Sequence, residues 1–472
     1  MSLVHTPRIA RWPILAVMIV AEVMDLAAST IVNVAGPALG NALRASTGQM
    51  QWVIGAYPLT LGAGLVLGGR LGDRLGRRRM FLAGLVGFTL SSLLCAVAPS
   101  PGILIACRLL QGVAGAILLP QGLGLLRENF PGPDLAKVFG IFGPILGLAG
   151  IVGPVLGGAL IAADFFGLGW RLVFLINVPV GVACFVTAWR CLPHRRGDRS
   201  VDIDVAGATL LFTSSVLLVL PLGQSDQWAT WTWPCLAGAA VGFAAFVVRQ
   251  RTVVRAGRTP LVLPSIFQRP AFAAGLAGIA LFFCSLVGTQ LVLTLFLQIG
   301  HGFTPGGASI ANLPFAVGTA IGATLSGAVL AARFGRTVLQ LGAAVQLAGV
   351  GLLWSELGQR GLFSAWSVAP GTLVAGIGAG LVIAALFSIV LTALDATQIG
   401  SGSGVLSALQ SLAASIGVAV FGAVFFAAHP ASAPATAFAG TLVVQAVILC
   451  TFLGVTFLVP ARAREDVEVA LG

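Results

Sequence analysis

Three ionisable side chains interrupt long apolar runs of this sequence: Glu22, Asp25 and Arg108. Such a group costs about 2.5–3.5 kcal/mol at the centre of a bilayer, so it persists where it pairs or lines a wet cavity. Glu22 and Asp25 are three residues apart and therefore share one face of a helix, as do Arg108 and Gln111. We expect the two faces to meet, with one carboxylate paired to Arg108. The other would be protonated readily, because burial and a like-charged neighbour disfavour its ionised form.

A buried carboxylate that exchanges protons can take up a proton on one side of a membrane and release it on the other. This chemistry would drive the exchange of protons for a second solute. The alternative is a static Asp25–Arg108 pair that only fixes one helix against another.

The composition identifies the elements that must position these groups. The chain has 472 residues, of which 57% are hydrophobic and only 9% are charged, and its mean hydropathy is +1.00. Globular domains contain about 25% charged residues, so this chain requires lipid as part of its solvent. Its apolar runs are long and unbroken, which favours spanning helices over the alternating strands of a barrel. We therefore predict an all-α polytopic membrane protein.

Fourteen apolar runs have about the length that one span requires. They cover residues 12–36, 50–69, 79–98, 102–126, 138–162, 171–191, 205–223, 231–248, 271–298, 306–332, 337–355, 367–391, 402–427 and 437–459. A count of twelve, without the pair at 205–248, is the alternative.

The distribution of basic residues tests this assignment of spans. With both termini cytoplasmic, the inner segments hold 22 of the 26 Lys and Arg residues, the outer segments hold three, and Arg108 lies within a span. Cytoplasmic loops of membrane proteins carry this excess of basic residues. The densest group is the segment from Gly68 to Arg79. The net charge of +11 therefore reflects membrane topology, and we expect no nucleic-acid partner.

Motifs for enzymatic or metal chemistry are missing from the sequence. The seven cysteines have no paired spacing, which predicts free buried thiols rather than disulfides or metal ligands. There is no HExxH, nucleotide-binding loop or GxSxG motif. We expect no enzyme activity, no catalytic residues, no metal and no cofactor, with an ion gradient as the energy source. A membrane enzyme, a receptor and a channel are the competing classes.

An internal repeat relates the two ends of the chain. A shift of 259 residues places Gly68, Leu71, Arg74, Gly76 and Arg77 over Gly327, Leu330, Arg333, Gly335 and Arg336, with Ala332 in place of Asp73. We therefore expect an N-terminal six-helix half at 1–200, two inserted helices at 201–258 and a C-terminal six-helix half at 259–472. Repeated halves around a midplane site are typical of secondary transporters.

Several motifs occur in a consistent order along the chain. They are Thr30-Ile-Val-Asn33, Gln51-Trp52, Ala56-Tyr57, Gly69 to Arg79 (GRLGDRLGRRR), Arg108-Leu-Leu-Gln111-Gly112 and Gly153-Pro154-Val-Leu-Gly157-Gly158. Together they resemble the major facilitator superfamily, and within it the drug:proton antiporters with fourteen transmembrane helices. This resemblance implies the major facilitator fold with a 6 + 2 + 6 arrangement of helices.

The chain departs from the family pattern at three positions. Helix 1 usually carries an acidic residue where this chain has Ala28, and Asp25 lies nearly one turn earlier on the same face. We expect Asp25 to substitute for it. Ala149 stands where a glycine is usual, and Pro58 stands where an apolar residue is usual. These departures bear on the details of coupling.

The resemblance also implies roles for the motif residues. Proton coupling is assigned to Asp25, Glu22 and Arg108, and a conformational gate is assigned to Gly69, Asp73, Arg74, Gly76 and Arg77. In the family, the aspartate of the gate latches the two halves in the outward-facing state. The antiporter motif of Gly153, Pro154, Gly157 and Gly158 is linked to preventing leak. A topology anchor and generic helix packing are the respective alternatives.

The remaining candidates are polar residues within spans that would line a substrate cavity: Asn33, Tyr57, Gln111, Gln290 and Asn312. Each is equally expected to form a helix–helix hydrogen bond. We expect efflux of a bulky, largely apolar drug or antibiotic by a monomer in the cell membrane, with protons as the coupling ion. An importer or symporter of a small solute is the alternative within the same family.

Overall fold

The computed structural model describes residues 11–130, 153, 156–199, 201–222, 231–326, 330–357, 364, 366–391, 394, 399–428 and 432–459, and all regular structure in these residues is helical. The longer helices are α1 (Arg11–Leu43), α2 (Thr47–Leu75), α3 (Arg77–Ala96), α4 (Pro101–Asn129), α7 (Asn177–Cys191), α8 (Val205–Leu222), α9 (Thr232–Arg255), α10 (Pro270–Leu295), α11 (Pro305–Leu325), α13 (Arg336–Glu356), α14 (Ala369–Leu391), α15 (Ile399–Ala427) and α16 (Pro434–Thr456). Short elements are η2 (Phe165–Gly167), η3 (Gly169–Arg171), α6 (Leu172–Leu175), η4 (Pro264–Gln268), the π-helical turn η5 (Phe296–Gly300) and α12 (Ala331–Phe334).

The observed helices confirm the predicted fold class. Within the described residues, twelve helices are long and apolar enough to cross a membrane, and α8 is a shorter apolar helix. Thirteen of the fourteen predicted runs coincide with these helices, within a few residues at most ends. The fifth run, 138–162, falls largely outside the described residues, so the count of fourteen stays a prediction.

Polar residues set the starts of the helices. Ser46 and Gln49 form a reciprocal capping box at α2, because Ser46 Oγ accepts from the Gln49 N–H and Gln49 Oε1 accepts from the Ser46 N–H. Ser100 caps α4 by a single bond, because its Oγ accepts from the Ile103 N–H, and Pro101 lies in the first turn. Some helices extend beyond the ends of the predicted apolar runs. For example, α9 continues through its arginines to Arg255, because arginine ends an apolar run but favours a helix.

Glycines at the α2–α3 and α12–α13 junctions adopt positive φ. Gly76 has φ +98° and is the single residue between α2 and α3. Gly335, its partner in the sequence repeat, has φ +52° and precedes α13. Residues with a side chain rarely adopt these angles, so glycine permits both tight turns. The repeat seen in the sequence is therefore accompanied by a glycine of positive φ at both junctions.

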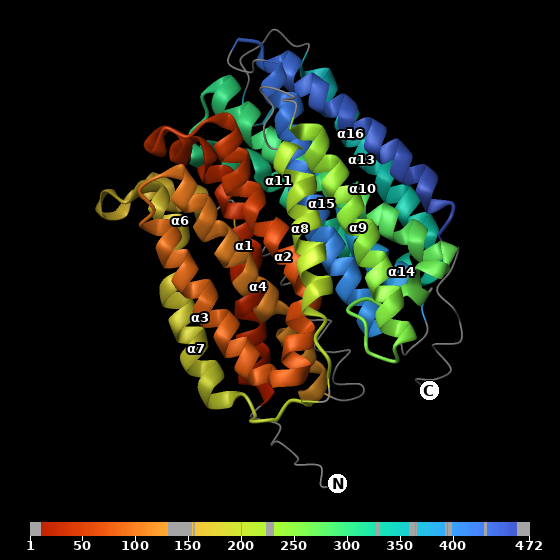
Figure 1. The fold of residues 1–472 in the computed structure, drawn as a ribbon. Helices are drawn as coiled ribbons and strands as arrows, with labels where there is room; N and C mark the ends of the chain where they lie inside the picture. The colour runs from red at the N-terminus through yellow and green to blue at the C-terminus, as the bar shows by residue number, and fades with distance from the viewer. Residues whose placement is uncertain are drawn as a thin grey trace. The chain divides into compact units, whose positions relative to one another are not determined.

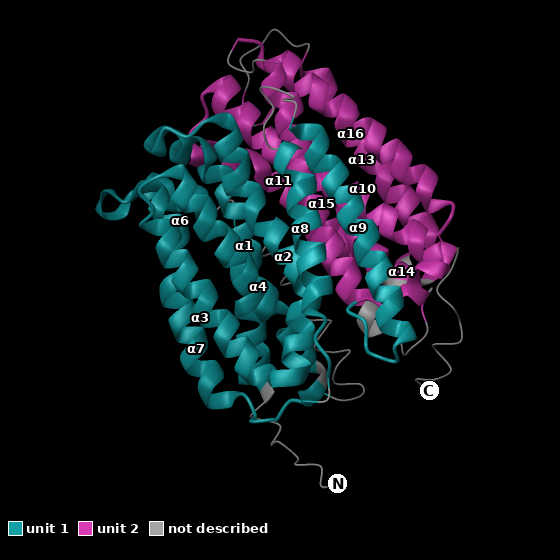
Figure 2. Ribbon diagram, in the orientation of Figure 1, with its two compact units in different colours: residues 1–221, 229–261 teal, residues 222–228, 262–472 magenta. Residues whose placement is uncertain are grey.

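The chain forms two compact units (Figure 2). One comprises Met1–Pro221 and Ala229–Leu261, and the other comprises Leu222–Trp228 and Val262–Gly472. In the first unit, α4 packs against α2 and α3, and α7 packs beside α3 and α1 (Figure 1). In the second unit, α14 packs against α11 and α13, and α16 packs against α10 and α13. The helices of the two units thus contact one another in the same order, with α1, α2, α3, α4 and α7 matching α10, α11, α13, α14 and α16.

Helices α8 and α9, predicted as a central insertion, cluster with the first unit. A buried carboxylate joins them, because Asp204 accepts hydrogen bonds from Arg249 Nε at 2.7 Å, Gln250 Nε2 at 2.9 Å and the Gly207 N–H at 3.0 Å. Asp202 lies nearby on the surface and pairs with Arg258 at 2.8 Å. In the first ion pair Asp204 is buried and Arg249 is 38% exposed, whereas both partners of the second pair are exposed.

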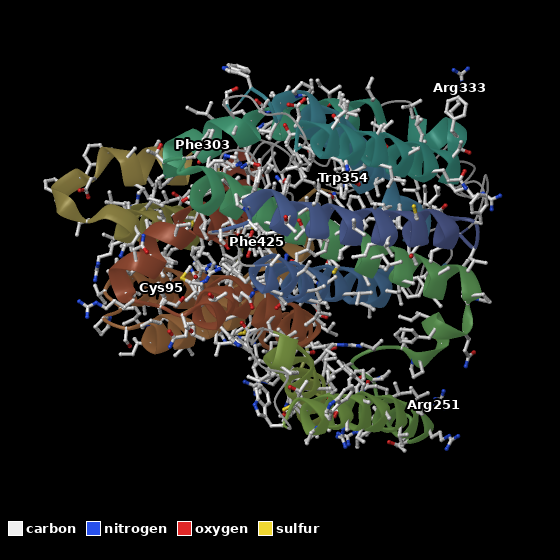
Figure 3. The ribbon with its side chains drawn as sticks, turned by 90° about the horizontal axis from the view of Figure 1, so that it is seen from above. Cys95, Arg251, Phe303, Arg333, Trp354 and Phe425 are labelled. Atoms are coloured by element: carbon white, nitrogen blue, oxygen red, sulfur yellow. The ribbon has the colours of Figure 1, made fainter. Side chains whose placement is uncertain are left out.

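The arginines and cysteines lie largely where the sequence predicts them, with one exception among the cysteines. Arg251 of α9 and Arg333 of α12 point away from the helices (Figure 3). All seven cysteines are free, as predicted. Cys95, Cys107 and Cys184 are buried, whereas Cys450 is exposed on α16, so the expectation of buried thiols was wrong for Cys450.

Candidate functional site

A hydrogen bond between α1 and α2 lies at the centre of the first unit. The Tyr57 hydroxyl donates to Oδ1 of Asp25. Tyr57 is fully buried and Asp25 is only 6% exposed. A carboxylate in such surroundings requires a donor, because an unpaired charge in a low-dielectric interior is expensive. The single tyrosine of the chain supplies that donor.

Arg108 of α4 lies over the ring face of the same tyrosine. Its guanidinium carbon is 4.5 Å from the centre of the Tyr57 ring, a cation–π contact. Its Nε donates to the Val53 carbonyl at 3.1 Å, and its Nη1 donates to Gln111 Oε1 at 2.6 Å. Its Nη2 is buried and has no partner among the described residues. Arg108 thus keeps one unused donor inside the helical bundle.

The chain of contacts continues to α3. Gln111 Nε2 donates to Ser92 Oγ at 2.7 Å, and both side chains are fully buried. The network therefore joins α1, α2, α4 and α3 through Asp25, Tyr57, Arg108, Gln111 and Ser92. Because every link crosses between helices except the Arg108–Gln111 bond, a shift of one helix would disturb the others.

Glu22 lies on the same face of α1 as Asp25, as its spacing predicts. A Cβ placed on Gly115 of α4 would lie 3.5 Å from Asp25 Oδ1, and one placed on Gly122 would lie 4.0 Å from Glu22 Oε1. Both carboxylates therefore face α4. Glu22 is half-buried, whereas Asp25 is buried.

The structure differs from the expected direct ion pair with Arg108. Among the ion pairs of the described residues, none joins Arg108 to Asp25 or Glu22. Tyr57 stands between the two charges instead, with its hydroxyl toward Asp25 and its ring under the guanidinium. Aromatic rings attract cations, so one side chain serves both partners.

The predicted gate lies at the junction of α2 and α3. Arg77 Nη2 donates to Asp73 Oδ1 at 2.8 Å, and Arg77 Nε lies 3.1 Å from Glu128 Oε1 at the end of α4. The Asp73 side chain is 40% exposed and that of Arg77 is 31% exposed. The arginine thus connects an aspartate of α2 to a glutamate of α4.

The segment that follows α7 lies against this junction. The Asp198 N–H donates to the Asp73 carbonyl at 2.9 Å, and Arg195 lies 3.8 Å from Glu128. Arg78, which is buried, donates to the Trp189 carbonyl in the last turn of α7 at 2.5 Å and contacts the His194 ring. The predicted gate is therefore bound on two sides, by α4 and by the chain after α7.

The antiporter motif is partly described. Pro154 lies outside the described residues, whereas Gly153, Gly157 and Gly158 are buried and residues 156–163 are helical. A Cβ on Gly153 would overlap Thr30, and one on Gly157 would overlap Ile31. These glycines therefore let this segment approach α1 closely, in the turns that follow Asp25.

The remaining predicted cavity residues are divided between the units. Asn33 of α1 and Asn312 of α11 are both 7% exposed, and the side-chain oxygen of each has no partner among the described residues. Asn312 Nδ2 donates to its own helix at Ala308, 3.0 Å away. Gln290 of α10 lines a pocket inside the second unit.

Several residues of the site were not singled out from the sequence: Ser92, Glu128, Trp189, His194 and Asp198. Each acts through a partner far along the chain, which a local motif does not reveal. Glu128 carried the clearest signal, because it is an acidic residue at the end of a span that faces a basic loop.

Comparisons with known proteins agree with this geometry. The family model described as Major Facilitator Superfamily matches residues 18–418. The probable actinorhodin transporter of Streptomyces coelicolor is 44% identical over 417 residues, which cover 87% of this chain and 72% of that protein. The tetracenomycin C resistance and export protein of Streptomyces glaucescens is 32% identical over 426 residues, covering 88% of this chain and 76% of that protein. The puromycin resistance protein of Streptomyces alboniger is 30% identical over 410 residues, covering 86% and 80%.

Solved structures support the same fold. A bacterial homologue of the human lysosomal transporter Spinster, in an inward-facing and occupied conformation, matches with a TM-score of 0.66 at 16% identity, covering 96% of this chain and 97% of that one. A structure of the proton dependent oligopeptide transporters matches with a TM-score of 0.63 at 16% identity, covering 95% and 97%. With the helical repeat and the family match, these findings show that the chain is a multi-pass membrane transporter that belongs to the major facilitator superfamily.

Proposed function

We propose that this chain exports small, largely apolar drugs or antibiotics across the cell membrane in exchange for protons. The observation that supports this most is the buried Asp25–Tyr57 hydrogen bond beside Arg108. An ionisable group within a membrane span is a candidate proton carrier. The relatives named for antibiotic export and resistance support the class of substrate.

In this proposal Asp25 takes up a proton from the outer side and releases it to the inner side during each cycle. Tyr57 donates to the carboxylate when it is ionised, and Arg108 supplies positive charge across the tyrosine ring. Gln111 holds the guanidinium in place. Glu22 is a second acid on the same face, nearer the start of α1.

The gate residues at the membrane surface would form and break their contacts during the same transport cycle. Asp73 and Arg77, bridged to Glu128, latch one conformation and must separate for turnover. Gly153 and Gly157 pack closely against α1, and together with Gly158 they would limit leak. We further propose a monomer with two six-helix halves at 1–200 and 259–472, two inserted helices at 201–258, and both termini in the cytoplasm.

A drug panel tests this function. Cells that express the chain are compared with vector controls for the accumulation of antibiotics and fluorescent dyes, with and without a protonophore. Export by proton exchange predicts lower accumulation of at least one compound, and the protonophore should abolish the difference. Unchanged accumulation across the panel would reject drug export. Higher accumulation would indicate import, and export that resists the protonophore would reject proton coupling.

A further inference from the structure

A pocket with several polar groups in a mostly apolar lining lies inside the second unit, among α10, α11, α13, α14 and α16. It is lined by Thr289, Gln290, Phe315, Gln346, Thr372 and Gln445, together with aliphatic side chains. The residues come from five helices spread over more than 150 positions of the sequence, and no charged side chain is among them. This pocket is separate from the network around Asp25, which belongs to the first unit.

Three oxygen atoms in this pocket have no hydrogen-bond partner among the described residues: Thr289 Oγ1, Gln346 Oε1 and Gln445 Oε1. Their side chains are 9%, 1% and 2% exposed. A buried polar atom without a partner costs about 1–3 kcal/mol, and here three such atoms gather in one place. An amide oxygen only accepts hydrogen bonds, so the missing partner must donate them.

The residues that line the pocket are buried on one side and half-buried on the other. Gln346, Thr372 and Gln445 are buried, whereas Gln290 and Phe315 are half-buried, so the opening lies on the side of α10 and α11. Its cavity of about 10 Å³ has the room that one water molecule or one hydroxyl group requires. A donor group carried on a larger molecule can therefore enter from the α10–α11 side.

The network inside the first unit is charged, unlike this pocket. There α1, α2 and α4 bring together Asp25, Tyr57 and Arg108, and α10, α11 and α14 hold the equivalent packing positions in the second unit. The second unit places neutral amides and hydroxyls in its pocket. A neutral lining stabilises a neutral ligand and offers no counter-charge to an ion.

We propose that this pocket binds a neutral hydroxyl group carried on an apolar transported molecule, with Gln346 and Gln445 accepting its hydrogen bond and Thr289 completing the site. The apolar remainder of the molecule lies toward Phe315 and the aliphatic lining. This assignment rests on the proposed function and names the substrate chemistry that the second unit recognises.

The test compares 2-naphthol with 2-methoxynaphthalene, in which a methyl group replaces the hydroxyl hydrogen and so removes the donor. Their affinities for the purified full-length protein are measured by fluorescence titration at neutral pH. The wild-type chain should bind 2-naphthol about fivefold more tightly, the factor expected of one neutral hydrogen bond. Thr289→Val, Gln346→Leu and Gln445→Leu should each reduce this preference toward one. These variants remove atoms that have no protein partner, so the fold should tolerate them.

Ser285→Ala is the matched control. Ser285 lies one turn from Thr289 on α10 and is fully buried, and its hydroxyl also has no partner among the described residues, but it does not line the pocket. This variant should keep the wild-type preference. Absence of saturable 2-naphthol binding, an equal affinity of the wild type for both probes, or an unchanged preference in all three pocket variants would overturn the proposal. Those results would assign the pocket to a permanently bound water. A failed drug panel with an intact hydroxyl preference would instead reject the export function alone.

Discussion

The hydroxyl of Tyr57 donates to the carboxylate of Asp25 inside the first unit, and Arg108 lies over the face of the same tyrosine. One side chain therefore contacts both an acid and a base, which form no direct ion pair among the described residues. A direct buried pair resists separation, because each partner would be left as an uncompensated charge. With Tyr57 between them, Asp25 can lose or gain a proton while Arg108 keeps its other contacts.

Replacing Tyr57 with Phe should slow transport about tenfold, because hydrogen bonds to charged groups contribute about 1.5–3 kcal/mol. The ring and its contact with Arg108 remain, so only the donor to Asp25 is lost. The measurement is the initial rate of drug export at equal protein levels in the membrane. An unchanged rate would show that Asp25 does not require this donor.

Two adjacent serines on α3 test whether the network positions Arg108. Ser92 accepts from Gln111, whereas Ser91, which is also buried, bonds only to backbone carbonyls of its own helix. Ser92→Ala leaves a buried amide donor without its partner, which costs about 1–3 kcal/mol and should lower the export rate several-fold. Ser91→Ala should leave the rate near that of the wild type. Equal effects of the two substitutions would argue against a positioning role for Gln111.

The helices were predictable from the sequence to a large extent, and the site only in part. The apolar runs marked α1 to α4 and α10 to α16 within a few residues at most ends, because the requirement for about 20 apolar residues acts locally. Asp25, Arg108 and Gln111 were found because charge and amide groups stand out in such runs. The bond from Tyr57 to Asp25 joins positions 32 residues apart and depends on how α1 packs against α2. Gln346 and Gln445 line one pocket because α13 packs against α16, and the spacing of residues in the sequence does not reveal this contact.

Asp73→Asn tests the latch at the α2–α3 junction. The Asp73–Arg77 pair is partly exposed, so its loss should cost about 1 kcal/mol or less of stability. The melting temperature and membrane insertion should therefore stay unchanged, while export slows several-fold because one conformation loses its latch. Asp164→Asn, in an exposed loop remote from this junction, is the control. Normal export by Asp73→Asn would leave the loop with a topological role only.

The α8–α9 pair offers a buried and an exposed aspartate for comparison. Asp204 is 4% exposed in its side chain and accepts from three groups, so Asp204→Asn should destabilise the protein by about 3 kcal/mol. Asp202 is 44% exposed and pairs only with Arg258, so Asp202→Asn should leave the melting temperature unchanged. Thermal unfolding in detergent measures both. A larger loss for Asp202→Asn would contradict the assignment.

The difference in stability between the wild type and Asp204→Asn should depend on pH. Burial alone would raise the pKa of Asp204, but hydrogen bonds from Arg249, the Gly207 N–H and Gln250 outweigh it and hold the pKa below the ordinary aspartate value. A lowered folded-state pKa stabilises the fold above the unfolded value of about 3.9, and this contribution is lost as the pH falls through the folded value. The difference between wild type and Asp204→Asn should therefore be full at pH 6 and shrink below about pH 4. A difference that grows on acidification would contradict this sign.

The central claim is that Asp25 carries the coupling proton, and proteoliposomes test it most directly. Uptake of one exported drug is measured twice, first driven by an imposed pH gradient and then as counterflow without a gradient. Asp25→Asn should abolish gradient-driven accumulation, by about tenfold or more, while counterflow persists, since the amide cannot release a proton. Gradient-driven accumulation by Asp25→Asn at the wild-type level would contradict the claim.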